Sequence, residues 1–279
     1  MQSPSTATLS GRLIPPRFSQ FTAISAVFTA LIFWFLTKLP RCFGKTLEVI
    51  VIGIVVPAHD EEERIALCLQ SLQKAAVHPA LLGEAVEIIV VLDACSDGTG
   101  RLARKWGART VSVKGRNVGL ARQAGARTAL ASGARWLAFT DADTVVAPDW
   151  LAMQLALNAD AVCGTVAVED WGSYGEQMQQ HFRSTYTDED GHSHIHGANL
   201  GVCAAAYATA GGFLGLKTGE DVALVEALRS SGAKIAWSRS PRVVTSVRAT
   251  YKAPNGFGAR LESIQKLQQW DVVSSAVAV

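Results

Sequence analysis

Short apolar runs alternate with amphipathic stretches through the middle of the chain. Runs rich in β-branched residues predict buried strands. They cover residues 47–57, 86–92, 109–113, 135–140 and 161–168. Between the first two runs, Ile65, Cys68, Leu69 and Leu72 recur at helical spacing and predict a helix with one buried face. This alternation predicts an α/β fold with a mostly parallel sheet flanked by helices.

Capping and turn residues predict where further helices begin and end. Asp97 is a candidate N-cap for a helix that Gly107 ends, and Asn117 is one for an Ala-rich helix that Gly133 ends. Pro148 predicts the start of the helix after that.

A polar stretch interrupts this pattern before regular elements resume. Residues 171–198 are rich in polar residues, glycine and histidine, and a long irregular segment of this kind predicts a functional loop or lid. Beyond it, the sequence predicts a helix over 219–231, strands over 234–238 and 242–247, and a last helix over 259–270.

Pattern changes divide the chain into three parts. Residues 1–17 are rich in Ser, Thr and Pro and are predicted to be disordered. Residues 18–37 carry no charge and have the length of a membrane-spanning helix, although Ser and Thr leave an amphipathic or core helix open. We therefore predict an N-terminal part over 1–45, a globular domain over 46–250 and a tail over 251–279.

Charges around the uncharged stretch predict its orientation if it spans a membrane. Two arginines precede it and three basic residues follow it, which places the globular domain on the cytoplasmic side. If the stretch is not an anchor, we expect a cytoplasmic protein. Signal-peptide cleavage is disfavoured because no small-residue site follows.

Composition narrows the classes of partner. Hydrophobic residues make up 49% of the chain, enough for a large core, and the charged fraction of 18% favours membrane association. The net charge of +2 does not indicate the strong excess of basic residues that is typical of nucleic-acid-binding proteins. Five scattered cysteines without a C-x-x-C motif favour free thiols in a reducing compartment.

Acidic residues stand at the ends of three predicted strands. They are Asp60 and Glu61 after the first, Asp93 after the second, and the pair Asp141 and Asp143 after the fourth. Ligands of an open parallel sheet bind at this edge, and clustered carboxylates need a cation or hydrogen-bond donors. Hard oxygen ligands suit Mn²⁺ or Mg²⁺ shared with substrate phosphates.

Each acid also has a purely structural interpretation. Asp60 followed by Glu63 fits a capping box for the first helix, and Asp97 fits a helix cap. Asp93 could start a turn, and a lone D-x-D motif occurs by chance in many chains. The order of these residues along the predicted elements is what favours a site.

Six segments in order resemble the glycosyltransferase family 2 proteins of the GT-A fold. They are VVPAHDEEERIALCLQSL, EIIVVLDACSDGT, GRNVGLARQAG, WLAFTDADTVVAPDWL, GANLGVCAAAYATAGGF and GEDVALVEALRSSGAKIAW, within about residues 50–240. The resemblance implies a Rossmann-like nucleotide-binding half followed by an acceptor-side half. It implies metal-dependent transfer of a sugar from a nucleotide diphosphate sugar.

The resemblance also implies nucleotide-side roles for named positions. The segment from Pro57 to Glu61 would line the nucleotide pocket, with Ala58 and Glu61 near the base or ribose. Asp93 would accept a hydrogen bond from a uracil ring, which favours a UDP-sugar while GDP- and dTDP-sugars stay open. Arg122 would lie near the nucleotide.

Two further acidic pairs are implied to act on the metal and the acceptor. Asp143 would bind the metal directly, and Asp141 would lie nearer the ribose or the metal. Glu220 and Asp221 match the acidic pair of the acceptor-side helix, with Asp221 as the general base of an inverting reaction. A helix-start acid is the structural alternative for Asp221.

The chain departs from the family pattern in places. It has His59-Asp60 where the family often has Tyr-Asn, and Leu92-Asp93 where it often has Asp-Asp. The Q-x-x-R-W signature of processive synthases is missing, which favours transfer of one sugar. The acceptor is unidentified; a lipid or glycan fits cell envelope glycan or glycolipid biosynthesis.

His192, His194 and His196 alternate along the chain and leave two interpretations open. Alternate residues can face one side, as a zinc site requires. Because they adjoin the matched segment beginning at Gly197, contact with an acceptor or a phosphate is the alternative.

Three rival functions would each leave a different signal in the sequence. A nucleotidyltransferase would need a basic Gly-rich loop after the first strand, where this chain has PAHDEEER. A dinucleotide oxidoreductase would need G-x-G-x-x-G there. A membrane-tethered, non-catalytic nucleotide-sugar-binding or scaffold protein with a degenerate transferase domain stays open.

Overall fold

The computed structural model describes residues 51–169, 171 and 175–246. A division by internal contacts falls after Glu48, so every described residue belongs to the second of two units. The uncharged stretch 18–37, the predicted helix 259–270 and the predicted parts 1–45 and 251–279 lie outside the described residues. No helix within the described ranges is both long enough and apolar enough to cross a membrane.

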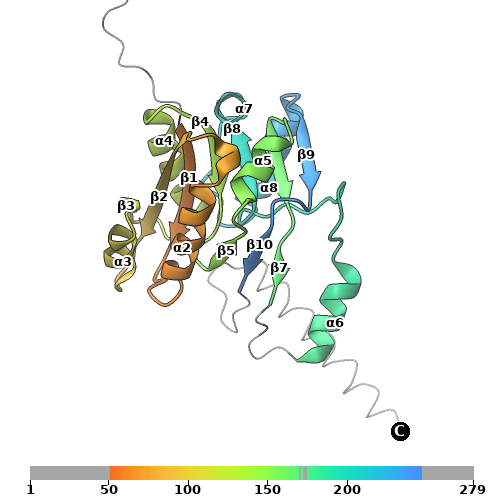
Figure 1. The fold of residues 1–279 in the computed structure, drawn as a ribbon, viewed down its shortest axis with the longest axis horizontal. Helices are drawn as coiled ribbons and strands as arrows, with labels where there is room; N and C mark the ends of the chain where they lie inside the picture. The colour runs from red at the N-terminus through yellow and green to blue at the C-terminus, as the bar shows by residue number, and fades with distance from the viewer. Residues whose placement is uncertain (1–50, 170, 172–174, 247–279) are drawn as a thin grey trace, which may run out of the picture. The chain divides into compact units, whose positions relative to one another are not determined.

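A seven-stranded sheet forms the centre of the described unit (Figure 1). Its strands in spatial order are β3 (Arg109–Val113), β2 (Ala85–Asp93), β1 (Val51–Ala58), β4 (Ala134–Phe139), β8 (Leu200–Cys203), β6 (Ala161–Gly164) and β9 (Ile235–Ser238). The first four are parallel, β8 is antiparallel to both of its neighbours, and β9 is parallel to β6. The predicted mostly parallel α/β sheet is confirmed.

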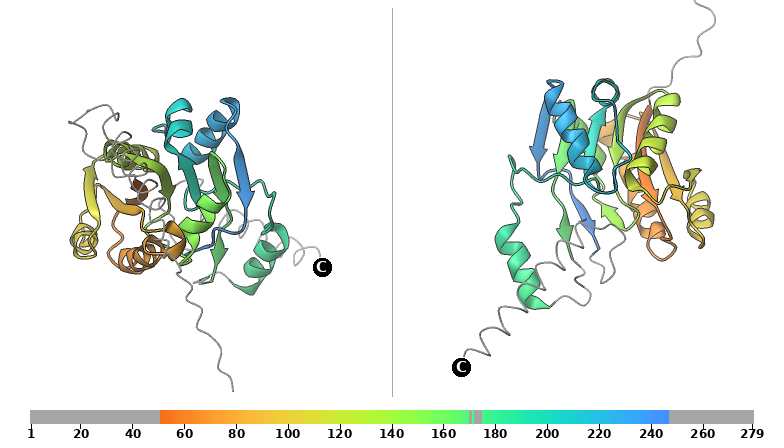
Figure 2. Two further views of the ribbon diagram at one scale, coloured as in Figure 1. Left: turned by 45° about the horizontal axis from the view of Figure 1, so that its top comes forward. Right: turned by 180° about the vertical axis from the view of Figure 1, so that it is seen from behind.

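Helices cover both faces of this sheet because its strands bury side chains on both sides. One face packs α2 (Ile65–Ala76), α3 (Thr99–Lys105) and α5 (Trp150–Ala156). The other packs α4 (Val118–Ala131), α7 (Ala204–Thr209) and α8 (Glu220–Ser230), as the view from behind in Figure 2 shows for α4 and α8. Along β1, Ile54 and Val56 belong to the first core while Val55 belongs to the second.

A second, three-stranded sheet follows the D-x-D segment. Its order is β5 (Thr144–Val146), β10 (Val243–Thr245) and β7 (Ala167–Val168). β10 is antiparallel to β5 and parallel to β7. This sheet therefore ties the chain just after β4 to the end of the described residues.

The predicted strand over 161–168 is wrong as one element, because β6 and β7 belong to different sheets. The side chain of Asn199 occupies the space beside Gly164, where an added Cβ would lie 2.2 Å from its Nδ2. Asn199 Nδ2 also donates to the carbonyl of Thr165 at 2.7 Å. These contacts from a distant residue turn the chain out of the large sheet.

Two helix predictions also need correction. The helix expected from Pro148 begins at Trp150, with Asp149 as its N-cap residue. The stretch 171–198, predicted to be irregular, contains α6 (Glu176–Thr185). Met178 and Phe182 stand four residues apart on α6 and form a short apolar stripe within a polar sequence, a signal that the prediction of an irregular segment overlooked.

Gly125 provides a test of the packing between α4 and the sheet. A Cβ at this position would lie 2.4 Å from Val55 Cγ1 and 2.9 Å from Val91 Cγ2. Helix propensity alone would make Gly125→Ala stabilising by about 1 kcal/mol, but overpacking costs about 1–3 kcal/mol. We expect the free energy of unfolding in urea to fall by about 1 kcal/mol.

Leu67→Ala is the control, because Leu67 is 61% exposed on α2, so the substitution changes a helix surface without touching the packing against the sheet. Its free energy of unfolding should stay within about 0.5 kcal/mol of the parent protein. A Gly125→Ala variant that is more stable than the parent would contradict this helix–sheet packing.

Candidate functional site

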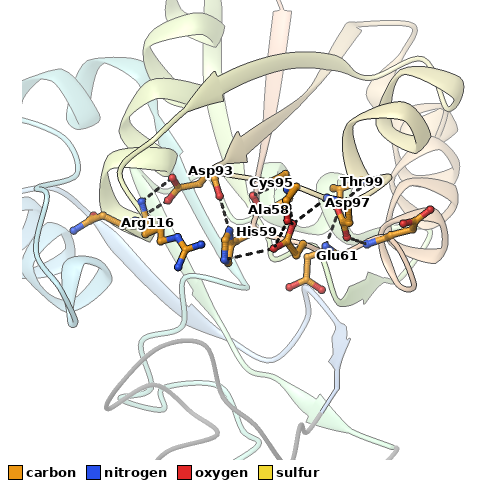
Figure 3. Close-up of polar contacts among 12 residues, drawn as sticks. Ala58, His59, Glu61, Asp93, Cys95, Asp97, Thr99 and Arg116 are labelled. Atoms are coloured by element: carbon orange, nitrogen blue, oxygen red, sulfur yellow. Dashed lines mark hydrogen bonds and ion pairs between the residues drawn. The ribbon is translucent and has the colours of Figure 1, made fainter.

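Asp93 ends β2 and holds the turn before α4. Its side chain is buried, and its two carboxylate oxygens accept hydrogen bonds from the backbone N–H groups of Arg116 at 2.8 Å and Asn117 at 2.6 Å. His59 Nδ1 lies 2.6 Å from the Asp93 carbonyl oxygen (Figure 3). A carbonyl only accepts, so Nδ1 carries the proton. The predicted contact of Asp93 with a uracil ring stays a prediction.

Asp60 links the loop after β1 to the loop after β2. Its carboxylate accepts from the backbone N–H groups of Ser96 at 2.7 Å and Asp97 at 3.3 Å. The predicted capping box of Asp60 and Glu63 is therefore wrong. Helix α2 begins only at Ile65, without a side-chain cap, and Asp60 has a left-handed backbone with φ of 50°.

Asp97 joins the same two loops in the opposite direction. One of its oxygens accepts from the N–H of Thr99 at 3.0 Å, which closes a turn just before α3. The predicted N-cap is wrong by one residue, because Gly98 is the N-cap and makes no side-chain cap. The other oxygen accepts from the backbone N–H of Glu62 at 3.0 Å. Thr99 Oγ1 in turn accepts from the backbone N–H of Glu61 at 2.7 Å.

These hydrogen bonds favour the ionised carboxylates. The bond from Ser96 is the largest influence on Asp60 and lowers its pKa. Partial burial opposes ionisation of Asp97, but the hydrogen bonds from Thr99 outweigh it and lower the pKa of that carboxyl as well. The two loops are thus held together by anions that accept backbone N–H groups.

Asp60, Cys95 and Asp97 bring three potential ligand atoms within 4.8 Å of one another. Both carboxylates already accept backbone N–H groups, and Cys95 Sγ donates to the carbonyl of Ala58 at 3.2 Å. Burial raises the pKa of the Cys95 thiol. A protonated sulfur does not suit Mn²⁺ or Mg²⁺, so this group is a loop brace.

Asp141 and Asp143 follow β4 and form the D-x-D pair. Ala142 between them is buried, while both aspartates are half-buried. Asp141 Oδ1 accepts from Arg122 Nη2 at 2.5 Å, and Asp143 Oδ2 accepts from the hydroxyl of Ser246 at 3.2 Å. Two hard carboxylate donors at a strand exit fit a divalent cation that takes its other ligands from substrate phosphates.

Arg122 joins this pair to the start of α8. Its side chain is buried, and it donates to Asp141 and, through Nη1, to Glu220. Gly197 lies against the guanidinium, since a Cβ there would be 2.4 Å from Cζ. The sequence placed Arg122 near the nucleotide; the structure places its guanidinium between two acids. Direct nucleotide contact stays a prediction.

The pKa values of this buried cluster follow from burial and charge. Burial would lower the pKa of Arg122, but the negative charges of Asp141, Glu220 and Asp221 outweigh it, and the net shift is upward. Burial raises the pKa of Glu220 against the opposing influence of Arg122. The ion pair with Arg122 therefore offsets part of the cost of burying the Glu220 carboxylate.

Asp221 follows Glu220 but lies in a different environment. It is half-buried, whereas the side chain of Glu220 is 6% exposed. Asp221 Oδ2 accepts from the backbone N–H of Gly197 at 2.9 Å, and Asp221 Oδ1 accepts from the backbone N–H of Val222 at 2.9 Å. Gly219, with φ of 72°, provides the left-handed turn into α8.

The histidine segment stacks against the end of α6. The ring of Tyr186 lies 4.1 Å from that of His194 at an interplanar angle of 5°, and its hydroxyl lies 3.0 Å from His196 Nε2. The His192, His194 and His196 rings lie side by side, with centroids 5.5 and 5.8 Å apart. No metal-ligand group within the described ranges includes them, so this arrangement does not favour zinc.

Sequence reasoning missed the donors that hold these acids. Arg116, Asn117 and Gly197 contribute backbone N–H groups, which no residue type reveals. Ser246 contributes a hydroxyl from beyond the last matched segment. For Gly197 alone there was a signal in the sequence, because it directly follows the histidine run and opens a matched segment.

Comparison with known proteins yields a family and a fold. The profile described as "Glycosyl transferase family 2" matches residues 53–209, more than half of the chain. No curated protein sequence matches. Among solved structures, S. aureus TarS 1–349 in complex with UDP-GlcNAc superposes with a TM-score of 0.57 at 16% identity, covering 75% of this chain and 62% of that one.

Two further TarS structures give similar values. A longer S. aureus TarS chain has a TM-score of 0.56 at 15% identity, covering 71% of this chain and 37% of that one. TarS 1–349 in complex with UDP has a TM-score of 0.53 at 17% identity, covering 71% and 61%. This chain thus spans less than two thirds of each, and at such identities the likeness establishes the fold alone.

The loop brace predicts a specific pH dependence of stability. The lowered pKa of Asp60 means that its contribution is present above the ordinary aspartate pKa of about 4 and is lost as pH falls through the folded-state value. We expect Asp60→Asn to lower the urea midpoint at pH 7, and the difference from the parent protein to shrink below about pH 4.

Glu63→Ala is the matched control, because Glu63 is exposed and would be the partner of Asp60 in a capping box, which alanine cannot complete. Its urea midpoint at pH 7 should equal that of the parent protein. If the urea midpoint fell equally in both variants, the capping box would be correct and the loop brace would be wrong.

Proposed function

Because the chain belongs to glycosyl transferase family 2, we propose that it transfers one sugar from a nucleotide diphosphate sugar to an acceptor hydroxyl, with inversion at the anomeric carbon. Family and fold support nucleotide-sugar glycosyl transfer. The observation that carries the finer proposal is the buried Arg122, which holds Asp141 and the Glu220–Asp221 segment at one edge of the sheet.

The nucleotide would bind at the ends of β1 and β2. The segment from Pro57 to Glu61 and the end of β2 at Asp93 lie beside each other there, since His59 bonds the Asp93 carbonyl. We favour a UDP-sugar because of Asp93; S. aureus TarS was solved with UDP-GlcNAc and with UDP. Backbone donors hold Asp93 rigid, so a base can meet a carboxylate that is already oriented.

The D-x-D pair would hold Mn²⁺ or Mg²⁺. Asp143 would bind the ion, and Asp141, with one oxygen on Arg122, would place its other oxygen toward the ribose or the ion. When bound, the cation neutralises charge that grows on the leaving diphosphate. The residues present fit this group because their donors are hard oxygens at a strand exit.

Asp221 would act as the general base. The acceptor oxygen forms a bond to the anomeric carbon on the face opposite the diphosphate, the sugar–diphosphate bond breaks, and the acceptor proton passes to Asp221. One base and no enzyme nucleophile give inversion. Glu220 is committed to Arg122, so its part would be to position that guanidinium rather than to take the proton.

The acceptor and the location belong to the same proposal. A lipid or glycan acceptor at the cytoplasmic side of a membrane follows from the uncharged stretch 18–37. The competing proposal, a non-catalytic nucleotide-sugar-binding or scaffold protein, makes the opposite prediction for turnover.

The role of Asp221 can be tested by Asp221→Asn. We expect the affinity for the UDP-sugar, measured by calorimetry, to stay within a factor of about 3, while release of nucleoside diphosphate falls about 10²–10⁴-fold. Asp149→Asn is the matched control, because Asp149 is another half-buried acid at a helix start. Loss of donor affinity in Asp221→Asn would show that the residue has a different role.

The metal assignment can be tested by Asp143→Asn. Thermal unfolding is followed with UDP, GDP, dTDP and their sugars, each with and without Mn²⁺. In the parent protein, one nucleotide class should raise Tm only with metal, and Asp143→Asn should lose that rise. An Mn²⁺-dependent rise that survives in Asp143→Asn would remove it as a ligand. A folded parent protein that responds to no nucleotide would favour the scaffold.

A further inference from the structure

Three leucines stand exposed beside the start of α8. Leu214 is 53% exposed and Leu216 is 40% exposed, both in the loop between α7 and α8, and Leu120 on the first turn of α4 is 41% exposed. Leu120 lies beside the residue between the other two, because its Cδ2 is 2.8 Å from the position that a Cβ of Gly215 would take. Leu214, Leu216 and Leu120 are called the leucine surface below.

The exposure of these leucines does not result from a loosely held loop backbone. Asn117 Nδ2 donates to the carbonyls of Gly215 at 3.2 Å and Leu216 at 3.0 Å, and Gln123 Nε2 donates to that of Phe213 at 2.8 Å. Phe213 itself is fully buried. Side-chain donors therefore fix the backbone on both sides of Leu214 while the leucine side chains stay in solvent, where they forgo the stabilisation that burial gives.

Positive charge surrounds the leucine surface. Lys114, Arg116 and Lys217 are exposed, and Leu120 Cδ1 lies 3.3 Å from the position that a Cβ of Gly115, between the first two, would take. No acidic residue occurs in residues 112–120 or 211–219. The next acid, Glu220, is buried against Arg122. The exposed charges beside the leucines along these two segments are thus positive, and the nearest accessible acid is the half-buried Asp221, which accepts from the backbone of Gly197.

We propose that the leucine surface docks on the surface of an anionic phospholipid bilayer. Leucines at the centre would enter the boundary between headgroups and acyl chains, while Lys114, Arg116 and Lys217 contact lipid phosphates. A second copy of the chain fits less well, because a symmetric contact would bring like charges together. Three leucines also offer far less than the roughly 1,000 Å² that a stable interface buries.

The leucine surface lies next in sequence to the acidic pair of the candidate site. The loop leads through Gly219 directly into the Glu220–Asp221 turn of α8. Bilayer contact would therefore bring Asp221 close to the headgroups, and an acceptor hydroxyl carried by a lipid would suit it. This last step rests on the proposed function, whereas the docking itself does not.

The test uses the full chain and local hydrogen exchange. Exchange of backbone amides in peptides covering 213–219 and 114–120 is followed by mass spectrometry, without nucleotide or metal. The protein is incubated alone, with phosphatidylcholine vesicles, or with vesicles that also contain phosphatidylglycerol. We expect slower exchange in both peptides only with the anionic vesicles, whether or not the protein has transferase activity.

Variants separate the apolar from the charged contribution. The double variant L214S/L216S should bind anionic vesicles at least about tenfold more weakly, because two half-exposed leucines no longer partition. Lys217→Gln should weaken binding about fivefold, and only to anionic vesicles. Leu82→Ser is the matched control, since Leu82 is 92% exposed but precedes the amino end of β2, at the opposite edge of the sheet.

Three outcomes would overturn the proposal. Vesicle binding without slower exchange in the two peptides would place the membrane contact elsewhere on the chain. Slow exchange that rises with protein concentration in the absence of vesicles would identify a second copy as the occupant. Slow exchange of residues 214–219 at every concentration without vesicles would mean that the chain covers the leucine surface itself. All variants must keep the Tm of the parent protein for the comparison to count.

Discussion

The buried guanidinium of Arg122 is the interaction on which the candidate site depends. It comes from α4, and it joins an acid at the end of β4 to an acid at the start of α8. Removal of one partner from a buried charge cluster leaves a charge without compensation, which typically costs about 3–5 kcal/mol. Gly197 closes the arrangement, because any side chain there would enter the space of the guanidinium. One cation therefore links the end of β4 to the start of α8.

The sequence predicted a helix or strand correctly wherever the residues of that element carry the signal themselves. Apolar β-branched runs identified the parallel strands, and Asn117, whose side chain accepts from the N–H of Leu120 at 2.9 Å, identified the start of α4. The pattern failed wherever a distant residue decides the outcome. The break after Gly164 depends on Asn199. In α6 the apolar stripe is only Met178 and Phe182 in a polar sequence, which is a weak signal. The spacing of Asp60 and Glu63 fits a capping box equally well, but the left-handed backbone of Asp60 leads to the neighbouring loop instead.

The same distinction applies to the acids of the site. Their clustering at the strand ends follows from the sequence, since parallel strands end at one edge. What makes the cluster tolerable is a set of donors that the sequence hides. Asp60, Asp93, Asp97 and Asp221 all accept backbone N–H groups. In Asp60 and Asp97 these bonds lower the pKa and favour the ionised form, and in all four residues they fix the direction of the carboxylate. A rim of carboxylates can therefore persist at the edge of a folded domain. Part of the acidity that suggests a metal site from sequence is therefore structural, and the pair Asp141 and Asp143 is the part that a cation would use.

Glu220 and Asp221 illustrate how neighbouring residues of one type acquire different tasks. They are consecutive on the first turn of α8, so their side chains leave the helix about 100° apart. Glu220 is directed into the interior, where burial raises its pKa and Arg122 compensates its charge. Asp221 is half-buried at the surface, with one oxygen on Gly197. Without Arg122, Asp221 would stand beside an uncompensated like charge. The buried cation therefore does more than hold two elements together, because it also compensates the charge of the acid that directly precedes Asp221.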